Sequence, residues 1–230
     1  MLSKRLQTIL EQMKGPVSAD IGCDHGLLAC AAIQQGKAKR IYACDLRKGP
    51  LARAKEAVER FGLNDKEEQV VLLLQDGIPA TEEKLDEVVI AGMGGETIVR
   101  ILEKAPESAR QARLLLSPHS RPEELRAWLN EHSIPVSREI IIHEDRRHYP
   151  LLIIENGLQP QNAFSPADTF YYGLPEWNEK TASWLEEERK KWQAISVHHP
   201  EPDSEPHQRM TEIERLFTQH SKRKEDHTDV

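Results

Sequence analysis

The sequence is poor in cysteine and aromatic residues and contains no long apolar run. Its three cysteines are Cys23, Cys30 and Cys44. They are odd in number and lie in or beside segments expected to be buried, which indicates reduced thiols and not a disulfide framework. Their spacing does not predict a metal site. No apolar stretch reaches the roughly 18 residues of a membrane span, and the first residues lack the apolar core of a secretory signal. We therefore expect a cytoplasmic protein without membrane association.

The composition is that of an ordinary globular chain. Of its 230 residues, 38% are hydrophobic and 30% are charged, which excludes a disordered protein. This length suits one domain with an appendage. The net charge of −7 argues against a surface that binds nucleic acid over its whole extent, but it leaves room for a local basic patch.

Strand and helix patterns alternate along the first two thirds of the chain. A first helix is expected at residues 2–13, where apolar residues recur at helical spacing and Ser3 can cap the start. Nearly continuous apolar strands followed by helices indicate a parallel sheet covered on both faces. The expected strands are 17–21, 40–44, 69–74, 87–91 and 113–116, and the expected helices between and after them are 27–35, 50–61, 96–102 and 122–131.

Two more strands, 136–144 and 149–155, close this region. The charged turn Asp145-Arg146-Arg147 between them is too short to hold a helix, so the two strands should be antiparallel neighbours. Five parallel strands with a terminal antiparallel pair are the outline of a class I methyltransferase, whereas a dinucleotide dehydrogenase would add a further strand–helix unit. The predicted fold is α/β with a Rossmann-like class I methyltransferase sheet.

The composition changes after residue 157. A linker leads to a helix expected at 176–196, in which Trp177, Trp184 and Trp192 lie near heptad spacing. The proline-rich segment 198–206 should not be helical, and a second amphipathic helix follows it. We predict a C-terminal antiparallel, coiled-coil-like helical hairpin, with the tryptophans as its core and not as a platform for stacking bases. The expected domains are 1–157, and 158–230 for the linker and hairpin.

The loop after the first strand reads Asp-Ile-Gly-Cys-Asp-His-Gly over residues 20–26. It differs from the dinucleotide fingerprint G-x-G-x-x-G because Asp24 occupies the place of the middle glycine. A carboxylate there would repel a pyrophosphate, which disfavours a nicotinamide-dependent oxidoreductase. It suits a ligand with cationic groups, such as S-adenosylmethionine (SAM), which carries a sulfonium and an α-amino group.

Acidic residues end or follow three successive strands. These are Asp20, Asp45 and Asp76, and each by itself is also a common helix cap. Together they fall where ligands bind, outside the carboxyl ends of parallel strands. Asp45 can accept both ribose hydroxyls, and Asp76 can accept from the adenine amino group. The expected cofactor-binding residues are Asp20, Gly22, Cys23, Asp24, Gly26, Asp45, Leu46, Asp76, Gly77, Ala91, Gly92 and Met93.

These features together resemble the bacterial tRNA (adenine-22-N1)-methyltransferase family over essentially the whole chain. The resemblance rests on segments 2–8, 19–22, 24–25, 49–50, 76–77 and 90–95, the last reading Ile-Ala-Gly-Met-Gly-Gly. It implies SAM-dependent methylation of adenine N1 in the D-stem and loop region of tRNA, and it also implies the C-terminal hairpin. The chain departs from the family pattern at Cys23, at Cys44-Asp45 and at Ser117-Pro118-His119.

The loop after the fourth strand favours methylation of a ring nitrogen. Enzymes that methylate the exocyclic amine of adenine use an Asp/Asn-Pro-Pro-Tyr/Phe motif there, and this chain has Ala-Gly-Met-Gly-Gly at residues 91–95. Adenine N1 carries an in-plane lone pair and chiefly needs positioning, in a base that is extruded or unpaired. Asp24 can bind the adenine amino group, steady the N1 cation or hold the SAM amino group, and these roles stay open. The expected catalytic set is Asp24, His25, Pro118 and His119, although each histidine can equally be an ordinary loop residue.

Basic residues near this edge are candidates for tRNA contacts. The expected substrate-binding residues are Gly94, Gly95, Lys4, Arg5, Arg47, Arg121, Arg146 and Arg147, with Lys48, residues 37–40, Lys190 and Lys191 as further candidates. Two alternatives remain. One is a methyltransferase acting on another RNA, a protein or a small molecule. The other is a SAM-binding protein without catalysis, in which the departures at Cys44 and His119 mark lost activity. We expect a monomer without a metal.

Overall fold

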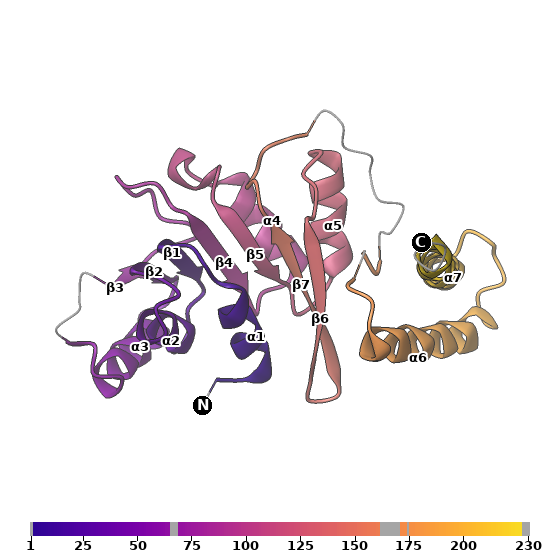
Figure 1. Ribbon diagram of the computed structural model, residues 1–230, viewed down its shortest axis with the longest axis horizontal. Coiled ribbons are helices and arrows are strands. Elements are labelled where there is room, and N and C mark those ends of the chain that lie inside the picture. The colour runs from indigo at the N-terminus through magenta and orange to yellow at the C-terminus, as the bar shows by residue number, and fades with distance from the viewer. Residues whose placement is uncertain (1, 65–68, 162–170, 174, 227–230) are drawn as a thin grey trace. The chain divides into compact units, whose positions relative to one another are not determined.

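The computed structural model describes residues 2–64, 69–161, 171–173 and 175–226 (Figure 1). The chain divides into two compact units, residues 1–165 and 166–230. Within the described part of the chain, no helix is both long enough and apolar enough to cross a membrane.

The first unit is built on a seven-stranded sheet with the strand order β3-β2-β1-β4-β5-β7-β6 (Figure 1). The first five strands pair in parallel, and β7 runs antiparallel to both β5 and β6. This confirms the predicted fold class. The strands are β1 (Val17–Ile21), β2 (Arg40–Asp45), β3 (Val70–Leu74), β4 (Glu87–Ala91), β5 (Arg113–Ser117), β6 (Arg138–Glu144) and β7 (Arg147–Ile154).

The turn between β6 and β7 is shorter than the sequence suggested. Only Asp145 and Arg146 form it, and both have left-handed backbone, with φ of 48° and 61°. Two successive left-handed residues form a tight two-residue hairpin turn. Such a turn allows the two strands to pair right up to the residues that flank it. The ladder therefore extends to the pair Glu144 and Arg147, and the prediction that Arg147 belongs to the turn is wrong.

Helices cover both faces of the sheet. Alternate residues of each strand point to opposite faces, so neighbouring residues of one strand pack into different cores. In β4, Val89 belongs to the core formed with α1 (Lys4–Gln12), α2 (Leu27–Gln34) and α3 (Lys48–Arg60). Its neighbours Val88 and Ile90 belong to the core formed with α4 (Gly95–Glu103) and α5 (Pro122–Glu131). A short 3-10 turn, η2 (Glu107–Ala109), lies between α4 and β5. Helix α3 begins two residues before its predicted start at Pro50, because proline is tolerated in a first helical turn.

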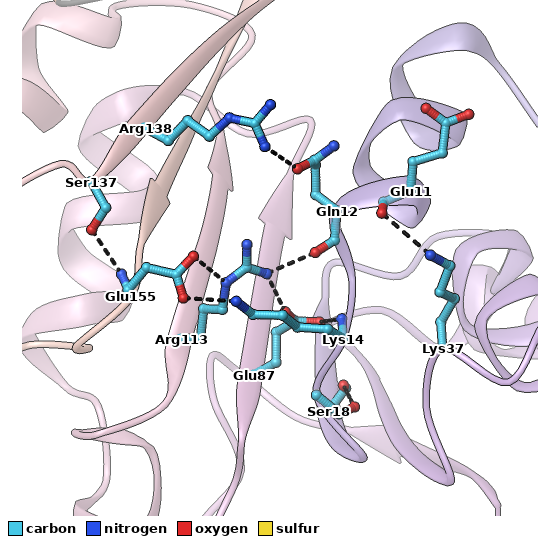
Figure 2. Close-up of polar contacts among 11 residues, drawn as sticks. Glu11, Gln12, Lys14, Ser18, Lys37, Glu87, Arg113, Ser137, Arg138 and Glu155 are labelled. Carbon is cyan, nitrogen blue, oxygen red and sulfur yellow. Dashed lines mark hydrogen bonds and ion pairs between the residues drawn. The ribbon is translucent and has the colours of Figure 1, made fainter.

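The ends of α1 are fixed by polar contacts. Ser3 caps its start as predicted, accepting from the Leu6 amide at 3.3 Å. At its other end, Arg113 donates through Nη1 to the Gln12 carbonyl at 2.8 Å and to Glu87 Oε2 at 2.6 Å, and through Nε to Glu155 Oε1 at 3.0 Å (Figure 2). Glu87 and Arg113 begin β4 and β5, so this network ties α1 to the amino ends of the parallel strands.

The second unit contains α6 (Glu179–Ser196) and α7 (Glu205–Asp226). Trp177, before α6, lies 5.1 Å from Phe217 late in α7, measured between ring centroids. Near the end of α6, the Trp192 ring lies 4.6 Å from the guanidinium of Arg209 early in α7. The helices are therefore antiparallel.

The tryptophans of this unit pack against its core, which confirms their predicted role. The buried members of that core are Tyr172, Leu185, Ile213 and Leu216. Helix α6 begins later than predicted because the side chain of Asn178 caps it, accepting from the Lys180 and Thr181 amides at 2.9 and 3.0 Å. The expectation that no residue of 198–206 is helical is wrong at its end, since α7 starts with Glu205 and holds Pro206 in its first turn.

Candidate active site

A cavity of about 790 Å³ opens at the carboxyl ends of β1 to β4, within the range of small-molecule sites. All of the predicted cofactor-binding residues except Gly26 line it. Further residues that no sequence motif marked also line the cavity, namely Leu6, Ile21, Leu27, Leu28, Gln75, Ile78, Thr97, Arg100, Ile101 and Lys104. The helical spacing of Thr97, Ile101 and Lys104 was the available signal for the α4 contribution.

The loop after β1 is held close to its neighbours on both sides. The amides of Gly22 and Cys23 both donate to the Cys44 carbonyl, at 2.8 and 2.9 Å. Gly22 has a φ of +74°, and a β-carbon on it would lie 2.2 Å from Met93 Cε. A side chain at this position would therefore displace Met93 within the cavity wall.

Gly26, in the same loop, lies against helix α3. It has a φ of +63°, and a β-carbon on it would lie 2.9 Å from the β-carbon of Ala54 in α3. Gly26 is not among the residues that line the cavity. Its lack of a side chain serves the close packing of α2 against α3.

Two buried carboxyl groups form the floor of the cavity. Burial, and after it the nearby Asp45 carboxylate, raises the pKa of Asp20 to about 7. Asp45 accepts the Arg47 amide at 2.9 Å. Burial likewise raises the pKa of the Cys23 thiol above its ordinary value, so this thiol is a neutral group beside the acids. A buried carboxyl group that titrates near neutrality is suited to a cationic partner.

Asp24 lies at the open side of the cavity, with its side chain 53% exposed. Its backbone is left-handed, with a φ of +45°. One carboxylate oxygen lies 3.2 Å from Arg53 Nη2, and the other lies 3.3 Å from His25 Nε2. The Arg53 contact was not predicted, because Arg53 lies in α3 and nothing near it in the sequence marks it as a partner of the first loop.

The glycines after β4 pack against the loop after β5. The His119 amide donates to the Met93 carbonyl at 2.9 Å, and the Gly95 amide donates to the Ser120 carbonyl at 2.8 Å. A β-carbon on Gly94 would meet Ser120 Oγ at 3.1 Å. Gly94, Gly95, Pro118 and His119 do not line the cavity. Gly95 is therefore approached by the protein's own backbone, and Gly94 chiefly by the Ser120 side chain.

The predicted basic residues fall into three groups. Arg5 and Arg47 line the cavity. Arg121 forms ion pairs with Glu96 and, at 2.6 Å, with Glu124. Three others do not line the cavity and are exposed on the surface, namely Lys4, Arg146 and Arg147.

The donors and acceptors of the cavity fit SAM. Asp20 is a buried carboxyl group that no side chain in the described ranges pairs with, which suits an ammonium or sulfonium. Arg5 Nε is buried and has no hydrogen-bond partner among the described residues, so a donor is available for an acidic group. Asp45 ends β2 and Asp76 follows β3, where the ribose and adenine of a nucleoside lie in such folds. This sheet and this cavity define a class I SAM-dependent methyltransferase.

Comparisons with known proteins narrow the class. Residues 2–152 match the family described as methyltransferase domain. The chain is 37% identical over 159 residues to the tRNA (adenine(22)-N(1))-methyltransferase of Bacillus subtilis (strain 168), an alignment that covers 68% of this chain and 66% of that protein.

Solved structures of other proteins are similar to this chain over nearly its full length. The B. subtilis m1A22 tRNA methyltransferase TrmK is 30% identical with a TM-score of 0.72, over 94% of this chain and 96% of that one. M. capricolum TrmK in complex with S-adenosylhomocysteine (SAH) is 27% identical with a TM-score of 0.77, over 95% of this chain and 98% of that one. The chain belongs to the family of bacterial tRNA (adenine-22-N1)-methyltransferases, which confirms the resemblance seen in its sequence.

Proposed function

We propose that the protein transfers a methyl group from SAM to N1 of an adenine in tRNA, at position 22 by analogy with its B. subtilis relative. The observation that carries this proposal is the position of Asp24. Its half-exposed carboxylate stands at the open side of a cavity whose buried acids fit the cofactor. The nearby β4 loop offers neither the acceptor nor the aromatic side chain that amino methylation of adenine requires.

The buried acids are assigned to the cofactor. Bound SAM supplies a methyl group activated by a sulfonium. Asp20 supplies a counter-charge to its ammonium, Asp45 accepts the ribose hydroxyls, and Asp76 accepts from the adenine amino group. Gly22, Gly77 and Gly92 leave room for the ligand because they have no side chains.

Asp24 is assigned to the target adenine. It is more exposed than Asp20, and Arg53 and His25 hold its two oxygens in place. A carboxylate there can accept from the adenine N6 amino group and so aim N1 at the methyl group. The reaction needs no base to remove a proton from N1 and no metal to activate it, and we propose that none takes part.

The surface cations are assigned to tRNA phosphates. Lys4, Arg146 and Arg147 are exposed and can bind backbone phosphates, whereas the ion pairs of Arg121 reduce its availability. We propose that residues 1–157 form the catalytic domain, that 158–230 form the linker and hairpin, and that Lys190 and Lys191 add a few contacts to tRNA. We further propose that the protein acts as a monomer in the cytoplasm.

The test is methyl transfer from labelled SAM to unmodified tRNA transcripts, with nucleoside analysis of the product. We expect 1-methyladenosine, and we expect its loss when adenine-22 is replaced or when the protein carries Asp24→Ala, which removes the acceptor. Glu131→Gln, an exposed acid at the end of α5, is the control and should retain activity. SAH binding without methylation of any RNA would instead favour another acceptor or a binding protein without catalysis.

A further inference from the structure

The amino-acid part of the cofactor carries a carboxylate as well as an ammonium. The acids Asp20, Asp24, Asp45 and Asp76 suit the cationic and hydroxyl groups of SAM, and none of them can bind its carboxylate when ionised. That group needs a cation or a cluster of donors. Which residue binds the carboxylate is a question that rests on the proposed use of SAM as cofactor.

The strand order gives the direction of the ligand along the cavity. In the order β3-β2-β1-β4, the carboxyl ends carry Asp76, Asp45, Asp20 and Gly92 in turn. With adenine at Asp76 and ribose at Asp45, the amino-acid part lies between the ends of β1 and β4. The close approach of Gly22 to Met93 marks the same place, because it joins the loops that follow these two strands.

Among the described residues, four cations line the cavity. Three of them lie in other parts of it. Arg47 lies beside Asp45, with Nε 3.6 Å from Oδ1. Arg100 donates to Thr97 Oγ1 at 3.2 Å. Lys104 caps the end of α4 and lines the cavity together with Ile101, whose Cγ2 lies 3.7 Å from a β-carbon built on Gly77. This part of α4 is therefore at the adenine end.

The fourth cation, Arg5, lies at the amino-acid end. Its Nη2 is 3.5 Å from a β-carbon built on Gly92, in the loop after β4. Its guanidinium carbon lies 4.9 Å from the centroid of the Tyr149 ring, and its backbone amide donates to Glu144 Oε1 at 3.0 Å. The end of the β6–β7 hairpin thus holds Arg5 at both its backbone and its side chain.

The guanidinium of Arg5 is oriented but not satisfied. Its Nε is buried, and within the described residues no hydrogen-bond acceptor meets it. A buried donor without a partner costs free energy unless a ligand supplies the acceptor. A guanidinium offers paired donors in a plane, the arrangement that matches a carboxylate. We infer that Arg5 binds the carboxylate of the cofactor's amino-acid part, a role different from the tRNA contact that its sequence position suggests.

The experiment is calorimetric binding of two ligands to the full-length protein and its variants. SAH carries the carboxylate, and decarboxylated SAH (S-adenosyl-3-thiopropylamine) keeps the adenosine, thioether and amine without it. We expect Arg5→Gln to weaken SAH binding by about 10- to 100-fold and to leave the affinity for the decarboxylated ligand unchanged. Arg5→Lys should recover part of the loss, because lysine keeps the charge but not the planar pair of donors. Lys14→Gln changes an exposed cation just after α1 that does not line the cavity. It is the control and should bind both ligands as the wild type does.

Each other outcome overturns the inference. Unchanged SAH binding by Arg5→Gln with a raised KM for tRNA assigns Arg5 to the RNA. Equal losses for both ligands mean that Arg5 shapes the cavity and does not bind the carboxylate. Binding of the decarboxylated ligand shows that the variant is folded, and it needs no tRNA. Failure of the wild-type protein to bind SAH overturns the proposed cofactor itself, and failure to methylate tRNA while SAH binds overturns only the proposed acceptor.

Discussion

Gly95 lies directly against the backbone of Arg121. A β-carbon on Gly95 would be 2.1 Å from the Arg121 carbonyl oxygen and 3.4 Å from the Leu125 amide nitrogen. This contact joins the first turn of α4 to the first turn of α5, and it places the β4 loop beside the β5 loop. The second glycine of the pair therefore has a structural role that is separate from the cofactor.

We expect Gly95→Ala to lower the free energy of unfolding by at least about 1–3 kcal/mol, the cost of overpacking a filled site. The obstacle is backbone, which cannot rotate away as a side chain can. Urea unfolding followed by circular dichroism measures the change. Gly94→Ala is the matched control and should cost less, since its β-carbon would meet the Ser120 hydroxyl at 3.1 Å and backbone no nearer than 4.0 Å. Equal losses in the two variants would contradict this account.

We expect Asp20→Asn to stabilise the cofactor-free protein at pH 8 while abolishing detectable SAH binding. Burial raises the pKa of Asp20 to about 7, against an ordinary value of 3.8. Its contribution to folding is therefore favourable below pH 3.8 and is lost as the pH rises through 7. The neutral amide of asparagine removes the cost of the buried charge. Each kcal/mol gained in the free energy of unfolding should raise Tm by about 2–4 °C. Thermal unfolding at pH 5 and pH 8 measures it, and an equal gain at both values would contradict the prediction.

We expect SAH affinity to fall as the pH is lowered below about 7. The ammonium of the ligand stays charged over this range, and it binds the ionised form of Asp20, whose pKa near 7 is set by burial and by Asp45. Well below that pKa, the dissociation constant should rise by about tenfold for each pH unit. Calorimetry between pH 5.5 and 8.5 measures the dependence. His25→Gln should keep the same dependence, and its loss in that variant would assign the titration to the histidine.

We expect Glu87→Gln to lower the free energy of unfolding by roughly 3 kcal/mol. The change leaves the Arg113 guanidinium buried without its 2.6 Å anionic partner, and the figure is near the low end for a broken buried pair because Glu155 remains. Lys14→Gln removes an exposed partner of Glu155 from the same network and should cost less than about 1 kcal/mol. Chemical denaturation measures both.

The same two variants separate stability from ligand binding. The network lies at the amino ends of β4 and β5 (Figure 2), and the cavity opens at their carboxyl ends. Folded Glu87→Gln protein should therefore bind SAH with wild-type affinity. A weakened affinity would mean that the anchoring of α1 also controls the position of Arg5.

The sequence by itself determined the sheet and the acidic set of the site. Apolar periodicity is a local property, so it predicted all seven strands and the helices of the first unit to within a few residues, and it predicted that the second unit holds two helices. In a parallel sheet the carboxyl ends share one edge. The positions of Asp20, Asp45 and Asp76 at the ends of three such strands were therefore enough to place them together.

Only the tertiary structure decided what these residues touch. Gly26 packs on Ala54, and Gly95 packs on Arg121. Arg53 reaches Asp24 from another helix, and Arg5 is separated from Tyr149 by most of the sequence of the first unit. A glycine or a cation has the same appearance in a sequence whether it faces a ligand or another part of the chain. The partner is fixed only when distant segments pack, and its identity depends on distances of a few ångströms that no local pattern encodes.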